Sequence, residues 1–287
     1  MVTQISAPLT GTNIPEDGDA SVRIPLLGLG TWPMTGTECT EAAATALEAG
    51  YRHLDTAENY GNEDAVGRAV VGSGLRRDEV FVTSKINRQW HGPVDSVRAG
   101  LEAALERAGL VYFDLYLVHW PNPDQGNYVQ ACESLAELTG TGLIRSWGVS
   151  NFKPGHLQQV LEAGLVPAVN QIHCQPVFAQ PSVQEANAAA GVLTAAYTPL
   201  GRGGELLQQP AITQIASRLG RTPAQVVLRW HVQQGRIALP KSADPQRQRE
   251  NLDVFSFELT AEDLAAVDAL DSATPPDTFL DADEFGH

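Results

Sequence analysis

Four side chains in the first half of the chain have types that suit acid–base chemistry. Asp55 ends a short apolar run, Tyr60 lies on the segment just beyond it, and Lys85 closes a second apolar run. A free tyrosine has a pKa of about 10, and a neighbouring ammonium group favours the phenolate. We therefore expect Lys85 to lower the pKa of Tyr60, while the Asp55 carboxylate keeps the lysine charged and in place.

These groups suit the reduction of a carbonyl. A hydride added to the carbonyl carbon leaves charge on the oxygen, which needs a proton donor. Tyr60 would be that donor, and His119 at the end of a third apolar run would orient the carbonyl and stabilise the developing charge. Taken singly, each residue has a structural explanation, such as a turn cap or a hydrogen-bonded core histidine. Together the four predict carbonyl reduction, with no metal site.

Short apolar strands that alternate with amphipathic helices must position these residues. The predicted strands span residues 26–31, 53–56, 80–86, 113–120, 146–151, 168–172, 192–198 and 236–241. The predicted helices span residues 37–50, 62–71, 93–108, 128–138, 154–163, 183–190, 211–219, 223–234, 245–254 and 260–270. Eight such units in 287 residues fit an α/β fold of the (β/α)8 TIM-barrel type better than a doubly wound sheet. The first strand is not followed by GxGxxG, which also argues against a Rossmann domain.

The segment ends give further expectations. Thr37 is a candidate N-cap and Gly50 a candidate stop for the first helix, and Thr260 is expected to cap the last helix. Residues 1–25 are predicted to form a β-hairpin, with turn residues at 10–13 and 16–20. Residues 271–287 are rich in Pro and Asp and are predicted to form a tail or loop. The whole chain, residues 1–287, is predicted to be one domain.

The carboxyl ends of barrel strands surround one pocket, so their residues should meet there. Buried ionisable groups are costly unless they are paired, and this end of the predicted barrel has many of them. The residues concerned are Trp32, Asp55, Tyr60, Lys85, His119, Trp120, Ser150, Asn151, Gln171, Tyr197, Lys241 and Ser242.

Composition excludes several classes of partner. The formal net charge is −15, so nucleic acid and anionic membranes would be repelled. No apolar run approaches the roughly 20 residues of a membrane span, and the first residues lack a signal-peptide pattern. The cysteines, Cys39, Cys132 and Cys174, are scattered, which favours a reducing compartment. We expect a cytoplasmic protein, and a monomer because no association motif is evident.

Six segments together resemble the signature segments of the aldo-keto reductase superfamily. They are GYRHLDTAENYGNE, VTSK, YLVHWP, GVSNF, AYTPLGRG and LPKSADPQRQREN, and the resemblance runs in order from about residue 28 to residue 270. It implies a (β/α)8 barrel closed at its base by an N-terminal hairpin, and NADPH-dependent reduction of aldehydes and ketones. The catalytic residues implied are Asp55, Tyr60, Lys85 and His119, with Tyr60 as the general acid. Bacterial reductases of the 2,5-diketogluconate type are the most similar.

The resemblance also implies where NADPH binds. Ser150, Asn151 and Gln171 suit the nicotinamide carboxamide, and Tyr197 can stack on the nicotinamide ring. A lysine, a hydroxyl and an arginine near a helix N-terminus suit the adenosine 2′-phosphate, and a carboxylate and an amide on the same helix suit the adenine amine. Those five residues are Lys241, Ser242, Arg247, Glu250 and Asn251. The other cofactor residues implied are Gly30, Thr31, Asp55, Leu200, Arg202 and Ala243, with Arg202 near the pyrophosphate.

The expected substrate pocket is aromatic. It is formed by Trp32, Tyr60, Trp90, His119 and Trp120, with Phe279 of the tail as a further candidate. Such a pocket favours small aliphatic or aromatic aldehydes, α-dicarbonyls and keto-sugars.

The sequence departs from the family pattern on the sixth strand. Related chains usually read Asn-Gln-x-Glu-x-His-Pro there, and this chain keeps Gln171 but has His173 and Gln175 at the other two polar positions. We expect His173 to be structural.

Two other functions fit parts of the pattern. The same barrel could hold NADPH as a regulatory subunit with little turnover, although the docking patches and long N-terminal arm that would favour this are missing. A barrel hydrolase or isomerase could use Asp55 with a second carboxylate. Turnover that depends on the nicotinamide cofactor separates these hypotheses from a reductase.

Overall fold

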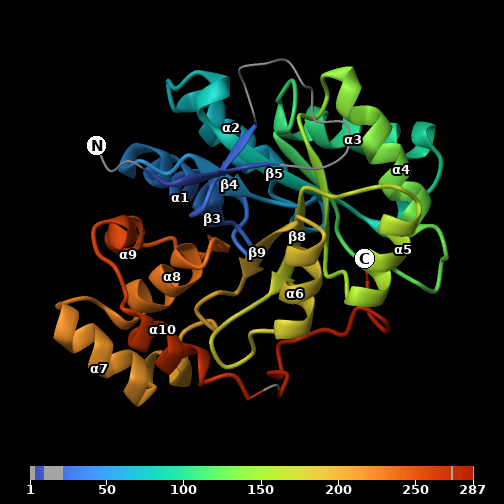
Figure 1. Cartoon of the computed structure of the whole chain (residues 1–287). Coiled ribbons are helices and arrows are strands. Elements are labelled where there is room, and N and C mark those ends of the chain that lie inside the picture. Colours follow the sequence, from blue (N-terminus) through green and yellow to red (C-terminus); the bar gives the residue numbers. More distant parts are fainter. Residues whose placement is uncertain (1–3, 10–21, 273, 287) are drawn as a thin grey trace.

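Eight parallel strands form the centre of the molecule, and helices surround them (Figure 1). The computed structural model describes residues 4–9, 22–272 and 274–286. Each strand pairs in parallel with the next in chain order, and Ala238 and Leu26 join the two ends through an N–H···O bond of 2.8 Å. The strands are β3 (Leu29–Gly30), β4 (His53–Asp55), β5 (Phe81–Ile86), β6 (Leu115–Val118), β7 (Trp147–Ser150), β8 (Val169–His173), β9 (Leu193–Tyr197) and β10 (Ile237–Leu239). The predicted (β/α)8 barrel is confirmed.

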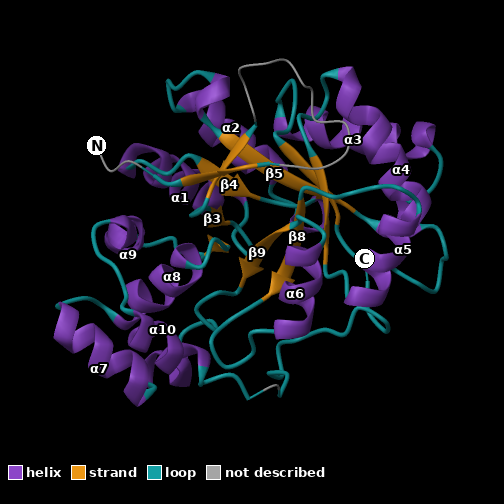
Figure 2. Ribbon diagram, viewed as in Figure 1, coloured by secondary structure: helices purple, strands orange, loops and turns teal. Residues whose placement is uncertain are grey.

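Figure 2 shows the helices outside the strands. They are α1 (Gly36–Ala49), α2 (Glu63–Gly72), α3 (Val94–Ala108), α4 (Tyr128–Leu138), α5 (Pro154–Glu162), α6 (Pro181–Ala189), α7 (Pro210–Leu219), α8 (Pro223–Gln233), α9 (Pro245–Leu252) and α10 (Ala261–Asp268). Most of them pack their apolar faces on the strands in a core that includes Leu54, Val82 and Leu117, whereas α7 and α10 pack with α8 in a second apolar cluster. No helix in the described ranges is both long enough and apolar enough to cross a bilayer.

Helix ends agree with the sequence at some positions and not at others. Gly50 ends α1 in the left-handed region (φ 117°), as expected for a glycine stop. The prediction of Thr37 as the N-cap is wrong, because the helix already begins at Gly36 after Thr35. Thr260 caps α10 as predicted: its side chain accepts the Asp263 N–H at 3.2 Å, and the Asp263 carboxylate accepts the Thr260 N–H.

A small antiparallel sheet lies at the amino ends of the barrel strands. Its strands, β1 (Ser6–Pro8) and β2 (Arg23–Pro25), pair directly. The chain continues from β2 into β3, and the Pro25 carbonyl meets the ring of His53, the first residue of β4. The hairpin expected at the base is confirmed, while its predicted turns, at 10–13 and 16–20, lie outside the described residues.

Several strands are shorter than predicted, since the apolar run continues into the loop that shapes the pocket. The run at 113–120 is a strand only over Leu115–Val118, and His119 and Trp120 follow it. At the barrel seam, a side chain at Gly30 would place its Cβ 2.8 Å from the Leu239 carbonyl oxygen, so only glycine fits there.

Candidate active site

One cavity of about 1430 Å³ opens at the carboxyl ends of the strands. Of the residues expected at the site, every one except Lys85, Trp90 and Phe279 lines it. The lining residues include Gly30, Thr31, Trp32, Asp55, Tyr60, His119, Trp120, Ser150, Asn151, Gln171, Tyr197, Leu200, Arg202, Lys241, Ser242, Ala243, Arg247, Glu250 and Asn251. Segments far apart in the sequence thus contribute to a single site.

Lys85 lies beneath the cavity floor and contacts both Tyr60, the predicted acid, and Asp55. The lysine is fully buried on β5, and its Nζ donates to Asp55 Oδ1 at 2.6 Å and to the Thr56 carbonyl at 2.8 Å. The same Nζ is 3.4 Å from the Tyr60 hydroxyl. The structure therefore brings Asp55, Lys85 and Tyr60 together as the sequence predicts.

The electrostatic effect on Tyr60 is opposite in direction to the expectation. Burial, followed by the Asp55 charge, raises the pKa of Tyr60 well above its usual value. Burial lowers the pKa of Lys85, while Asp55 acts in the other direction. Desolvation penalises the charged form of each group, so the phenol keeps its proton at neutral pH. Tyr60 is thus held as a proton donor whose strength is limited by its buried surroundings.

His119 faces the phenol from the end of β6, which is separated from β4 by β5. Its ring centroid is 5.8 Å from that of Tyr60 in an edge-to-face arrangement, and both side chains border the cavity. The His119 backbone is fixed on both sides, because its N–H donates to Ile86 and its carbonyl accepts from the Asn151 amide. A carbonyl oxygen placed between the phenol and the imidazole could be contacted by both.

The Asp55 carboxylate has a second partner from across the barrel. Gln171 of β8 donates to Asp55 Oδ2 at 2.7 Å, so each carboxylate oxygen accepts a separate donor. Thr31 donates both its N–H and its hydroxyl to the Asp55 carbonyl. The charge-assisted bonds from Lys85 and Gln171 fix the orientation of the carboxylate, and the bonds from Thr31 fix the backbone beside it.

Polar side chains of β7, β8 and β9 lie beside the predicted catalytic residues. Asn151 follows β7 in the left-handed region (φ 64°), and its amide contacts the Ser150 hydroxyl and accepts from Tyr197 at 2.8 Å. Ser150 in turn donates to the Gln171 carbonyl. The four residues expected at the nicotinamide therefore lie in one hydrogen-bonded group.

His173 lies next to this hydrogen-bonded group, between the rings of Tyr197 and Phe178. Its ring centroid is 5.4 Å from that of Tyr197 and 5.8 Å from that of Phe178. Burial, with a contribution from Arg202, lowers the pKa of His173 to about 4, and the Gln175 amide lies 3.3 Å from its Nε2. The neutral ring supports Tyr197 by packing, which agrees with the expected structural role.

Cationic groups gather at the opposite end of the cavity, around the start of α9. Lys241 and Arg247 are exposed there, and Asn251 is buried on the inner side of the helix. Asp244 is the N-cap of α9, and its Oδ1 accepts the N–H groups of Gln246 and Arg247. Sequence reasoning missed Asp244, although an Asp before a Pro at a helix start is a recognisable N-cap signal.

Arg202 and Trp32 meet across the cavity mouth. The guanidinium carbon lies 5.0 Å from the indole centroid, within cation–π range. The two residues follow β9 and β3, so their contact joins two loops over the opening.

Two aromatic residues expected in the substrate pocket lie elsewhere. Trp90 packs against Gly100 of α3, and its indole N–H donates to Glu58 at 3.0 Å. Phe279 turns toward Phe178, with ring centroids 4.9 Å apart. Neither residue lines the cavity in this structure. Sequence order cannot show toward which side a loop aromatic turns.

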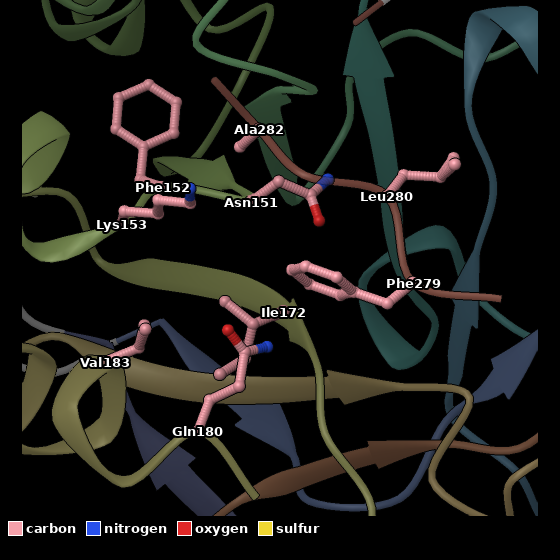
Figure 3. Close-up of a pocket in the computed structure, with 9 residues that line it drawn as sticks. All are labelled: Asn151, Phe152, Lys153, Ile172, Gln180, Val183, Phe279, Leu280 and Ala282. Atoms are coloured by element: carbon pink, nitrogen blue, oxygen red, sulfur yellow. The ribbon is translucent and has the colours of Figure 1, made fainter. Parts of the chain in front are cut away.

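Other tail residues line the cavity instead. They are Thr278, Leu280 and Phe285, and the Phe285 ring packs edge-on against Trp120 at 4.9 Å. Lys153, just before α5, holds the tail through ion pairs with Asp281 and Asp283, and His156 Nε2 of α5 lies 3.0 Å from Asp283 Oδ1. Figure 3 shows tail residues Phe279, Leu280 and Ala282 around a small pocket that Asn151 and Ile172 also line. The apolar residues of the tail follow no helical or strand periodicity, so the sequence could not show which of them line the cavity.

Asn62 is a further residue that the sequence did not single out. It is fully buried before α2, its amide donates to the Met34 carbonyl at 2.7 Å, and its carbonyl accepts from Thr56. It therefore ties the loop after β3 to the loop after β4. An Asn just before a helix suggests an N-cap, but its side chain makes no cap bond here.

Comparisons with known proteins agree with this geometry. The family model described as Aldo/keto reductase family matches residues 26–272. The 2,5-diketo-D-gluconic acid reductase B of Corynebacterium sp. (strain SHS752001) is 45% identical and covers 85% of this chain and 88% of its own. Methylglyoxal reductase DkgA of Yersinia pestis is 43% identical, covering 86% and 89%. A crystal structure of a Gox0644 variant in complex with NADPH superposes with a TM-score of 0.87 at 38% identity, covering 98% and 97%. The chain belongs to the aldo/keto reductase family, as its signature segments indicated.

Proposed function

We propose that this protein reduces aldehydes and ketones to alcohols with NADPH, and that Tyr60 is the general acid. The observation that carries the proposal is the position of the buried Lys85 Nζ, 2.6 Å from Asp55 and 3.4 Å from the Tyr60 hydroxyl, at the floor of a large cavity. Family membership and the NADPH complex of Gox0644 support both the reaction class and the cofactor.

The residues present fit NADPH along the cavity. One end has amide, hydroxyl and phenol groups suited to a carboxamide and an aromatic ring, and the other has Lys241 and Arg247 for phosphate. Gly30 adds only backbone to the cavity wall, because a Cβ there would lie 2.8 Å from the Leu239 carbonyl oxygen. Cationic side chains near the start of a helix bind anions such as phosphate favourably.

When bound, NADPH supplies the hydride. Tyr60 then donates its proton to the carbonyl oxygen, and the Lys85 ammonium beside it stabilises the phenolate that remains. Asp55 holds Lys85 in position through a buried ion pair, and the charge of that pair is balanced within the site. His119 orients the carbonyl from the other side of the phenol. Trp120 and Phe285 exclude water from one wall of the pocket.

The expected substrates are small aliphatic or aromatic aldehydes, α-dicarbonyls and keto-sugars. Trp32, Trp120 and Phe285 give the pocket an aromatic wall, while Asn59 and Tyr60 supply polar contacts. The names of the diketogluconate and methylglyoxal reductases among the relatives support the last two classes.

Cofactor oxidation tests the proposal directly. Purified protein is mixed with NADPH and either methylglyoxal or a nitrobenzaldehyde, and the loss of NADPH absorbance is followed. Oxidation that requires the carbonyl compound establishes the reductase. Tight NADPH binding without oxidation on a broad carbonyl panel would instead indicate the regulatory binding module, and turnover without nicotinamide would indicate a hydrolase or isomerase.

We also propose that residues 1–287 act as a single barrel domain in a cytoplasmic monomer that binds neither nucleic acid nor membrane. The net charge of −15 and the scattered, buried cysteines support this assignment. Light scattering on the eluting peak of a sizing column gives the mass, and a value twice that of the chain would contradict the monomer.

A further inference from the structure

The 2′-phosphate end of the cavity contains a carboxylate beside its arginine. Asp244 Oδ2 lies 3.6 Å from Arg247 Nε, and both residues line the cavity. Arg247 is the residue expected to bind the 2′-phosphate. A phosphate approaching it therefore meets a negative charge at the same place.

The same carboxylate also occupies backbone donors at the start of α9. Asp244 Oδ1 accepts the N–H of Gln246 at 2.8 Å and that of Arg247 at 3.0 Å. Free N–H groups in a first helical turn are the ones that bind phosphate. These backbone bonds also lower the pKa of Asp244, so the group is ionised at neutral pH.

The other carboxylate at this end is positioned differently. Glu250 accepts from the Gln246 side chain at 2.8 Å, one turn further along α9, and makes no ion pair with Arg247. Asp244 is thus the acidic group that competes for the arginine.

We propose that Asp244 reduces the preference of this enzyme for NADPH over NADH, so that both cofactors bind. In nucleotide sites, a carboxylate accepts a hydrogen bond from a free ribose 2′-hydroxyl, whereas an arginine binds a 2′-phosphate. This cavity end offers both groups at once. The inference rests on the proposed function, because it takes the cavity as the cofactor site.

Equilibrium binding of the two cofactors tests this role. NADPH and NADH are titrated into wild type and Asp244→Asn, and dissociation constants are read from the fluorescence of the bound dihydronicotinamide. Asparagine is as good an N-cap as aspartate, so α9 keeps its start while the charge is lost. We expect the Kd ratio to move toward NADPH by about fivefold, the size of one exposed charge pair near contact in water.

Two further variants keep the test decisive. Asp244→Ser also caps a helix and should shift the ratio in the same direction if the asparagine variant does not fold. Glu262→Gln removes one negative charge from the first turn of α10, outside the cavity lining, and should leave the ratio unchanged. Calorimetric titration with 2′,5′-ADP and 5′-AMP should show the same change without the nicotinamide.

The outcomes separate the two proposals. A Kd ratio that is unchanged in both Asp244 variants, or that moves toward NADH, overturns the role of Asp244 and leaves the reductase assignment intact. Wild type that binds neither cofactor would refute the cofactor site itself.

Discussion

Gln171 donates its side-chain amide to Asp55 Oδ2 at 2.7 Å, although 116 positions separate the two residues. This bond joins the group expected at the nicotinamide to the carboxylate that holds Lys85. The cofactor end and the proton-donating end of the site therefore share one buried hydrogen-bond network.

Replacing Gln171 should affect both cofactor binding and turnover. Gln171→Leu removes the amide that contacts Asp55 and is expected to contact the cofactor, so we expect NADPH affinity and kcat each to fall by about tenfold, the loss of one hydrogen bond to a charged group. Fluorescence titration and single-turnover kinetics measure the two effects separately. A loss of affinity alone would show that the bond to Asp55 has no catalytic consequence.

The hydroxyl of Tyr60, the proposed general acid, can be removed while its ring is kept. Tyr60→Phe should lower kcat by a factor of about 100 or more, because proton donation in the transition state is lost while the cavity is unchanged. The Kd for NADPH should stay near that of wild type. Tyr112→Phe is the matched control, since that phenol stacks on Arg77 far from the cavity lining. Near-normal turnover in Tyr60→Phe would make the assignment wrong.

Arg247 should distinguish the two nicotinamide cofactors. Arg247→Ala is expected to weaken NADPH binding about tenfold and NADH binding much less, because only NADPH presents a phosphate to the guanidinium. Arg249→Ala removes the same charge from the same helix at a position that does not line the cavity. Equal losses for the two cofactors would refute the 2′-phosphate assignment.

The tail should influence substrate choice without changing cofactor binding. Deletion of residues 278–287 removes Thr278, Leu280 and Phe285 from the cavity wall, so the ratio of kcat/KM between a bulky aromatic aldehyde and methylglyoxal should shift severalfold. The NADPH Kd is the control. If the substrate profile of the truncated protein matches that of the full chain, the tail does not act on the pocket.

A single substitution tests the role of the tail without deleting it. Lys153→Met removes the ammonium that pairs with Asp281 and Asp283, while every lining residue stays in the chain. Exposed ion pairs contribute about 1 kcal/mol or less. We expect the ratio of kcat/KM between the same two substrates to shift in the same direction as in the deletion variant, but by less.

Buried His53 should make stability depend on pH. Burial lowers its pKa from 6.5 to about 4, so between these values the unfolded chain binds the additional proton. The stabilising contribution of neutral His53 is therefore complete above pH 6.5 and is lost as pH falls toward 4. From pH 7 to pH 5 this one residue should cost about 2 kcal/mol of unfolding free energy.

Urea unfolding at the two pH values measures that loss. His53→Gln keeps a polar group opposite Thr83 and removes the titrating ring. The variant should lose about 2 kcal/mol less than wild type between pH 7 and pH 5, whatever its absolute stability. An identical pH dependence in both proteins would show that His53 is not held neutral.

The sequence by itself determined the architecture, and it brought the proposed catalytic residues to one end of the barrel. Short apolar runs alternating with helical periods leave few topologies other than a parallel barrel, and in a barrel all strand ends face one side. Residues that end strands, such as Asp55 and Ser150, could therefore be assigned to one pocket from their place in the alternation. Lys85 could be assigned in the same way, although it lies just beneath the floor.

Only the tertiary structure decided which groups touch and in which direction loop side chains turn. The bond between Gln171 and Asp55 joins strands on different sides of the ring, and no local pattern encodes it. Trp90 turned to Glu58, and Phe279 turned away from the cavity, because those partners come from distant segments. The pKa of Tyr60 is likewise raised by burial and by the Asp55 charge, and both depend on how the whole chain folds.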